Sequence, residues 1–305
     1  MGEAERAAPI VGVVPNFSEG RRDDVIDAIC DALEVPGARL VYRQADAEHH
    51  RLDTTVIGSA DAVRRSALAG AAIAVARIDL REHRGAHPRM GAVDVVPFMP
   101  VRGVGMDDVV ALARATGAEL ADTLGLPVYF YGEAATAPER RSLADVRRGG
   151  YEGVRDAVAA GERLPDLGPH DLGAAGAVAV GARMPLVAFN IYLTGDDASA
   201  AEAIARAVRE SNGGLRAVRA IGFAVPDRDA VTVSMNLVDH ATTGVREAFD
   251  AVAAHAADRG LEVLDAEIVG LAPAAAVPDA VAEHVRLRGF DPDRQILERL
   301  LEEER

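Results

Sequence analysis

One short segment of the chain, residues 81–94, gathers side chains that can donate, accept or bind charge. Its members are Arg81, His83, Arg84, His87, Arg89 and Asp94. Two glycines and a proline lie among them, and proline removes an amide donor, so a regular helix is excluded here. The apolar, β-branched run at residues 93–99 predicts a buried strand directly afterwards. Because loops that enter core strands often carry function, we expect a functional loop, with a solvated polar loop as the alternative.

Proton transfer without a metal is the chemistry that best fits these residue types. A neutral histidine in a partly buried loop can accept a proton near pH 7 and return it. A carboxylate such as Asp46 or Asp94 could orient that histidine or balance a cationic intermediate. Arginine has a planar fork that suits bidentate binding of carboxylates. The segment therefore predicts an acidic small-molecule ligand.

A metal site is the alternative for the same histidines. On a helix, the spacing of His83 and His87 would place both rings on one face, but the sequence between them disfavours a helix and no glutamate follows His83. A looser site stays open, formed by Asp46, His49, His50, Asp53 and His87. Nothing in the spacing demands that such ligands converge, so we expect no metal.

The absence of lysine narrows the reaction class. Lysine and arginine together number 33, and all are arginine, which excludes a Schiff-base lysine, a pyridoxal-phosphate anchor and a Walker-A loop. Cys30 lies on an apolar helical face and predicts a buried hydrophobe rather than a nucleophile. The acid and base are therefore expected to be histidine, aspartate or glutamate.

Composition describes a soluble globular chain of two-domain size. It has 305 residues, of which 49% are hydrophobic and 27% charged. The net charge of −15 argues against general binding to nucleic acid, which depends on neutralising phosphates. No apolar run reaches the roughly 20 residues of a membrane helix, and the N-terminus lacks a signal-peptide pattern. With one cysteine no intrachain disulfide can form, so we expect a cytoplasmic location.

The two halves of the chain share one order of expected elements. In the second half, strands are expected at 186–193, 218–225, 231–238 and 261–268, and helices at 199–210 and 245–259. This β-α-β-β-α-β order is the split ferredoxin-like arrangement. Residues 10–99 show the same order, and a helix at 107–124 and a strand at 128–131 follow. The expected fold class is therefore α/β (α+β), with two ferredoxin-like subdomains.

Four local features are also predicted. Ser18 is expected to cap the first helix, and residues 46–53 are expected to form a polar loop. Residues 165–176 hold too much glycine and proline for a regular element, so they predict a connection near the domain boundary or a disordered linker. Asp291 is expected to cap a final helix whose apolar face consists of Ile296, Leu297, Leu300 and Leu301.

Several strings of the sequence resemble the glutamate formimidoyltransferase family, the folate-dependent formiminotransferases of histidine breakdown. They are Val14–Gly20, Gly85–Asp94, Pro97–Gly103, Val128–Ala134, Gly181–Arg183, Ala188–Ile191 and Ile268–Leu271. The resemblance implies transfer of a formimidoyl group from N-formimidoyl-L-glutamate to tetrahydrofolate, giving 5-formimidoyltetrahydrofolate and L-glutamate. Tetrahydrofolate is then a co-substrate, and no metal is needed.

The resemblance also implies an architecture. It is a homodimer in which each chain has an N-terminal subdomain, residues 1–180, and a C-terminal subdomain, residues 181–305, with a folate tunnel between them. Larger relatives carry a helical cyclodeaminase domain after the transferase. Because this chain ends at Arg305, a stand-alone transferase is expected.

Individual roles follow from the resemblance. The family's proposed acid/base histidine falls on His87, and Asp46 is the first choice for a carboxylate that stabilises the amidinium charge. Substrate-binding roles are assigned to Asn16, Arg51, Arg89 and Arg183. The folate-binding segment comprises Gly168, Pro169, His170, Asp171, Leu172, Gly173, Ala174, Ala175 and Gly176.

One loop departs from the family's pattern. Where the family commonly reads His-Asn-Arg-Ser/Thr-Val, this chain reads His-His-Arg-Leu-Asp at residues 49–53. The arginine is kept, but an amide and a hydroxyl are lost. A related formimidoyl- or formyl-transferase, or a 5-formyltetrahydrofolate-salvage enzyme with a different amine partner, therefore stays open. A non-catalytic folate-binding module is the remaining alternative.

Overall fold

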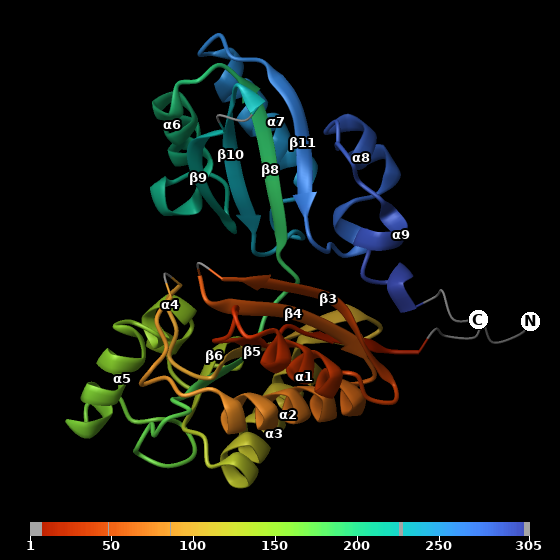
Figure 1. Cartoon of the computed structure of the whole chain (residues 1–305). Helices are drawn as coiled ribbons and strands as arrows, with labels where there is room; N and C mark the ends of the chain where they lie inside the picture. The colour runs from red at the N-terminus through yellow and green to blue at the C-terminus, as the bar shows by residue number, and fades with distance from the viewer. Residues whose placement is uncertain (1–7, 48, 86, 226–227, 302–305) are drawn as a thin grey trace, which may run out of the picture. The chain divides into compact units, whose positions relative to one another are not determined.

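The chain divides into two compact units, each with its own sheet and hydrophobic core. The computed structural model describes residues 8–47, 49–85, 87–225 and 228–301. The first unit ends at Arg183 and the second begins at Met184. Figure 1 labels helices and strands of both units. Both units combine helices with a mainly antiparallel sheet, which confirms the predicted α/β (α+β) class.

The second unit has the predicted ferredoxin-like order. Its elements are β8 (Val187–Thr194), α6 (Ala198–Val208), β9 (Val218–Val225), β10 (Ala230–Leu237), α7 (Val245–Ala257) and β11 (Val263–Val269). The strands lie in the order β11-β8-β10-β9, and all neighbours are antiparallel. Apolar residues of α6 and α7 join those of the sheet in one buried core. Alternating burial along β8 and β9 matches one covered face per strand.

The first unit contains the same plan. Its first elements are β1 (Ile10–Val13), β2 (Asn16–Phe17), α1 (Asp23–Leu33), β3 (Ala38–Asp46), β4 (Arg51–Gly58), α2 (Ala60–Arg77) and β5 (Val93–Arg102). Strand β4 pairs with β3 on one side and with β1 and β2 on the other, and β1 and β2 also pair with β5. The order β3-β4-β1-β5 is thus the counterpart of β9-β10-β8-β11. Pro15 separates β1 from β2 because it has no amide to donate to a neighbouring strand.

Two further strands extend this sheet. Helix α3 (Met106–Leu124) leads to β6 (Val128–Gly132), and β7 (Val178–Ala182) lies between β5 and β6, parallel to both. Strand β7 was not predicted. Its sequence, Val-Ala-Val-Gly-Ala, is short and rich in small residues, so its β-forming signal is weak, although every residue is buried. Helices α4 (Leu143–Val146) and α5 (Gly150–Ala159) lie in the segment between β6 and β7.

Helix α2 shows how small residues set the packing on this sheet. Ser59 caps the helix by accepting a hydrogen bond from the amide of Ala62. The buried face of the helix consists of alanine, glycine, serine and valine only. At Gly70 an added Cβ would lie 2.7 Å from a methyl group of Leu33. The absence of larger side chains therefore lets α1 and α2 approach closely.

One local prediction was wrong, and two others were right only in part. Ser18 does not cap α1, because its hydroxyl donates to the carbonyl of Gly91 at 2.7 Å. The polar loop is shorter than the predicted residues 46–53, since β3 continues to Asp46 and β4 begins at Arg51. Asp291 does cap a helix, α9 (Pro292–Gln295), but that helix ends after four residues, where the chain pairs with Ala272. The final apolar residues therefore do not form one helical face.

Candidate functional site

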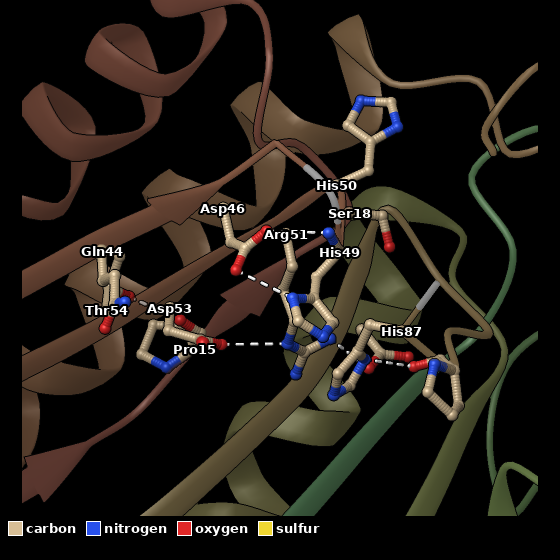
Figure 2. A network of polar contacts seen from close by, with 12 residues as sticks. Pro15, Ser18, Gln44, Asp46, His49, His50, Arg51, Asp53, Thr54 and His87 are labelled. Carbon is tan, nitrogen blue, oxygen red and sulfur yellow. Dashed lines mark hydrogen bonds and ion pairs between the residues drawn. The ribbon is translucent and has the colours of Figure 1, made fainter. Parts of the chain in front are cut away.

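His87 lies in the loop between α2 and β5, which is not helical, as the sequence predicted. Its ring is partly exposed, and Nδ1 lies 2.7 Å from the carbonyl oxygen of Pro88 (Figure 2). A carbonyl only accepts hydrogen bonds, so we assign the proton of the neutral ring to Nδ1. Nε2 then keeps its lone pair, and His87 can accept a proton through that atom.

A buried carboxylate, Asp94, joins two arginines beside this loop. Its Oδ2 accepts hydrogen bonds from Arg51 at 2.8 Å and from Arg147 at 2.9 Å, and its Oδ1 accepts the amide of Met90 at 2.8 Å. The register of the sheet explains why Arg51 and Asp94 lie together. Strand β2 pairs with the start of β4 on one side and the start of β5 on the other, so Arg51 and Asp94 come together.

These surroundings lower the pKa of His87 below its ordinary value of 6.5. Burial is the largest cause, and the guanidinium groups of Arg51 and Arg147 add to it. The carbonyl of Pro88 and the carboxylate of Asp94 oppose the shift without cancelling it. Neutral imidazole is therefore the main form at pH 7, and it is the form that a general base needs.

Asp46 bonds to both the ring and the backbone amide of His49. One carboxylate oxygen lies 2.8 Å from Nδ1 of His49, and the other accepts the His49 amide at 2.8 Å. The rings of His49 and His87 meet edge to face with centroids 6.3 Å apart, and in Figure 2 the ring of His49 lies between Asp46 and His87. Asp46 is thus placed to act on the site through a second imidazole.

Two of the predicted substrate arginines already bind protein carboxylates. Arg51 is buried, and besides Asp94 it holds Asp53 through Nε at 2.9 Å (Figure 2). Arg89 forms a bidentate pair with Glu152, with both distances 2.8 Å. This pairing lowers the pKa of Glu152 to about 2. A role of either arginine in binding substrate stays a prediction.

Arg183 lies just after β7, and it interacts with the buried Tyr131 of β6. Burial raises the pKa of Tyr131, and the positive charge of Arg183 opposes that rise. The pairing of β6 with β7 places Tyr131 opposite Gly181. A Cβ at Gly181 would lie 2.5 Å from Cε1 of the tyrosine ring, so glycine leaves the room that the ring needs.

Asn16 is placed on β2, opposite Asp53 of β4 and Val95 of β5. Its side-chain oxygen is enclosed and accepts no hydrogen bond within the described part of the chain. An enclosed acceptor without a donor costs free energy, which fits a group that a bound molecule would complete. Its role in substrate binding stays a prediction.

The segment 168–176 is ordered and lies against the loop of His87. The carbonyls of Ala174 and Ala175 accept the amides of Leu80 at 2.8 Å and of Ala92 at 2.7 Å. These two amides belong to the opposite ends of the His87 loop. Leu172 is buried, whereas His170 and Asp171 are exposed. The disordered-linker alternative was wrong, because these hydrogen bonds hold the segment against the His87 loop. The segment belongs to the first unit, which ends at Arg183.

Sequence reasoning missed several residues of this site, chiefly Arg147, Tyr131, Glu152 and Glu19, whose buried carboxylate lies 3.1 Å from Nε2 of His50. Arg147 follows α4 in a region where weak helical periodicity gave no chemical signal. Glu19 and Tyr131 lie within the strings Val14–Gly20 and Val128–Ala134, so those strings could have pointed to them.

Two features concern possible ligands and membranes. Outside the few residues whose placement is not described, no group of three or more histidine, cysteine, aspartate or glutamate side chains could hold a metal ion. The looser set around His49 and His87 therefore does not form such a group. Among the described helices, none combines the length and apolar character needed to traverse a lipid bilayer.

Comparison with known proteins gives matches along nearly the whole chain. The family model described as "Formiminotransferase domain, N-terminal subdomain" matches residues 10–183, and "Formiminotransferase domain" matches residues 188–298. A protein of Streptococcus pyogenes named glutamate formimidoyltransferase is 38% identical over 95% of this chain and 98% of its own length. One of Thermoplasma acidophilum with the same name is 38% identical over 96% and 97%. The formimidoyltransferase-cyclodeaminase of Rattus norvegicus is 40% identical, and the match covers 90% of this chain but 52% of that enzyme.

Proposed function

Because the chain belongs to the formiminotransferase family, we propose that it transfers a formimidoyl group from N-formimidoyl-L-glutamate to tetrahydrofolate. The products are 5-formimidoyltetrahydrofolate and L-glutamate. The similarity to two glutamate formimidoyltransferases over almost their full lengths carries this proposal. It makes the protein a transferase of one-carbon groups.

His87 is the proposed general acid/base. Folate N5 attacks the amidine carbon, its proton must leave, and the departing glutamate nitrogen must gain one. Nε2 of His87 can take the first proton and deliver the second, because burial and two guanidinium groups keep the ring neutral at pH 7. Asp46 contributes negative charge through its bond to His49, which favours the cationic form of the bound amidine.

Several of the remaining predicted residues bind the two substrates in this proposal. The segment Gly168–Gly176 binds folate, and its hydrogen bonds to both ends of the His87 loop would bring N5 close to the acid/base. Asn16 and Arg183 contact the amino acid, and Arg51 acts as part of a charge network with Asp94. Holding two reactants in one orientation supplies much of the rate in such a transfer.

Turnover with tetrahydrofolate and N-formimidoyl-L-glutamate tests the proposal. Formation of 5-formimidoyltetrahydrofolate is followed for the wild type, for His87→Gln and for the control His284→Gln, which alters an exposed histidine of the second unit. We expect His87→Gln to lower kcat by about 10²–10⁴-fold, the usual contribution of a positioned acid/base. A folate-binding module would bind tetrahydrofolate without turnover and would not respond to the substitution.

A second candidate is a related transferase with another amine partner. The observation in its favour is Asp53, which lies on β4 within the changed string of residues 49–53 and binds Arg51, so a protein carboxylate already compensates that arginine. Offering N-formimidoyl derivatives of glutamate, aspartate and glycine, together with 5-formyltetrahydrofolate, separates the two. A higher kcat/KM for any compound other than N-formimidoyl-L-glutamate would favour the second candidate.

We also infer a cytoplasmic homodimer whose functional subdomains correspond to the two units. The family resemblance supports this inference. Light scattering after size-exclusion chromatography would check it, and a mass near 32 kDa would indicate a monomer.

A further inference from the structure

His83 is a buried histidine with both ring nitrogens in use, four residues before His87. Its Nε2 lies 3.0 Å from the carbonyl oxygen of His50, and its Nδ1 lies 3.1 Å from Nε of Arg89. A carbonyl only accepts and a guanidinium only donates. The ring must therefore be neutral, with its proton on Nε2 and its lone pair on Nδ1.

His50, whose carbonyl oxygen lies beside Nε2 of His83, is itself held by several contacts. The rings of His50 and His83 stack with centroids 4.1 Å apart and planes inclined by 9°. The nitrogens of His50 lie 3.0 Å from the carbonyl of Arg84 and 3.1 Å from the buried carboxylate of Glu19. Glu19 in turn accepts three consecutive backbone amides at the turn before α1. One end of the His87 loop is thus tied to that turn and to the start of β4.

Arg89 supplies the second anchor of the loop. Its guanidinium spans from His83 to Glu152, and its carbonyl accepts the amide of Tyr151 at 2.8 Å. Tyr151 and Glu152 both belong to α5. The two anchors stand on either side of His87 in the chain, and the side chains of His83 and Arg89 are bonded to each other. The backbone around His87 is therefore held by side-chain hydrogen bonds on both sides of His87.

We propose that His83 is a positioning residue for the transfer reaction, and that its bonds to His50 and Arg89 hold the His87 imidazole in its working place. The inference depends on the proposed function, since it assigns a role within the same site. It also gives Arg89 a task other than the predicted binding of substrate. His83 itself touches no reacting atom in this proposal.

Burial supports the neutral form of His83. It lowers the pKa of the ring to about 4, and the positive charges of His50 and Arg89 act in the same direction. The ring of His83 is therefore neutral at pH 7. Protonation at Nδ1 would replace a hydrogen bond from Arg89 by repulsion between two cations.

The test compares His83→Leu and His83→Gln with the wild type and with the control His284→Gln, all in the full chain. Leucine removes both hydrogen bonds, and we expect kcat to fall by about 100-fold, the usual cost of a misplacement near 1 Å, with KM changed little. Glutamine can donate to His50 and accept from Arg89, so it should restore part of the loss. His284→Gln should match the wild type.

The pH dependence of kcat/KM gives a readout that a purely structural role would not move. The groups facing His87 are Arg51, Arg147, Asp94, His49 and the carbonyl of Pro88. If the loop loosens in His83→Leu, His87 becomes better solvated and its pKa rises toward 6.5. The acid limb of the profile should then move to higher pH.

Each result decides the matter. A folded His83→Leu variant with the kcat and acid limb of the wild type would overturn the proposal, as would a loss of kcat with an unmoved limb. If this variant does not fold, Glu152→Gln replaces it, because Glu152 is half exposed and its loss loosens only the Arg89 anchor. A folded Glu152→Gln variant with unchanged kcat would overturn the proposal as well. A wild type without turnover would instead refute the proposed function.

Discussion

Replacing Asp94 by asparagine should destabilise the first unit severely. The carboxylate is fully buried and is shared by Arg51 and Arg147, whose side chains are themselves 6% and 16% exposed. Asparagine keeps an oxygen for the amide of Met90 but removes the negative charge. Arg147 would then lose this carboxylate partner, and the buried Arg51 would keep only its ion pair with Asp53.

The size of the effect follows from burial. Removing one partner of a buried ion pair usually costs about 3–5 kcal/mol, because the remaining charge is left uncompensated in a region of low dielectric constant. Since asparagine preserves one hydrogen bond, we expect a loss near the lower end, about 3 kcal/mol. That is a large part of the roughly 5–15 kcal/mol that stabilises a typical protein.

Urea denaturation measures this loss, because guanidinium chloride would screen the ion pair. The chain has no tryptophan and five tyrosines, four of them in the first unit, so tyrosine fluorescence reports mainly on that unit. The matched control is Asp61→Asn. Asp61 also binds two arginines, Arg64 and Arg65, but it lies on the exposed surface of α2.

The control should change the free energy of unfolding very little, because exposed ion pairs are screened by solvent. If Asp94→Asn lost less than about 1 kcal/mol, the level of an exposed pair, or no more than Asp61→Asn, the reasoning would be refuted. The Asp94 charge also raises the pKa of His87. The acid limb of kcat/KM in folded Asp94→Asn should therefore move to lower pH.

Three further predictions concern pH and packing. In the wild type, kcat/KM should fall as the pH drops through a value below 6.5, where His87 becomes protonated, and His87→Gln should lose this limb of the pH–rate profile. Burial would raise the pKa of Glu19, but bonds from the amides of Arg21 and Arg22 and the charge of Arg22 outweigh it and lower the pKa. The stabilisation from Glu19 is complete when the pH lies above the pKa of 4.5 in the unfolded chain, and it is lost as the pH falls through the lower pKa of the folded state. Glu19→Gln should therefore flatten the dependence of the unfolding free energy on acid pH. An unchanged slope would contradict this prediction. Gly181→Ala should destabilise by about 1–3 kcal/mol through overlap with Tyr131. The control is Gly153→Ala within α5, where the added Cβ would lie 3.7 Å from the carbonyl oxygen of Arg148. This substitution should raise the free energy of unfolding by about 0.5–1 kcal/mol, measured by thermal or urea unfolding.

Much of the fold could be read from local patterns. The strands and helices of the second unit lie within a few residues of their predicted bounds, because alternating and helical periodicities are properties of short segments. The exceptions have tertiary causes. Strand β7 forms because β5 and β6 supply partners on both sides, and α9 ends where pairing with Ala272 competes with the helix.

The candidate site also has a part that the sequence predicted and a part that it did not. Its loop was predicted because histidine, arginine, glycine and proline coincide in one short segment, and the resemblance pointed to His87. The pairing of Asp46 with His49, of Arg89 with Glu152 and of Asp94 with two arginines was not predicted. Partner choice among many charged residues depends on distance in space, which sequence separation does not give.

The sequence by itself determined the alternation of strands and helices, the non-helical loop of His87 and, through several strings, the family. Only the tertiary structure decided which charges meet. The register of β2 between β4 and β5 brings Arg51 to Asp94, residues 43 positions apart in the chain. Because a carboxylate buried with two guanidinium groups has different chemistry from one in solvent, that register gives His87 its electrostatic surroundings.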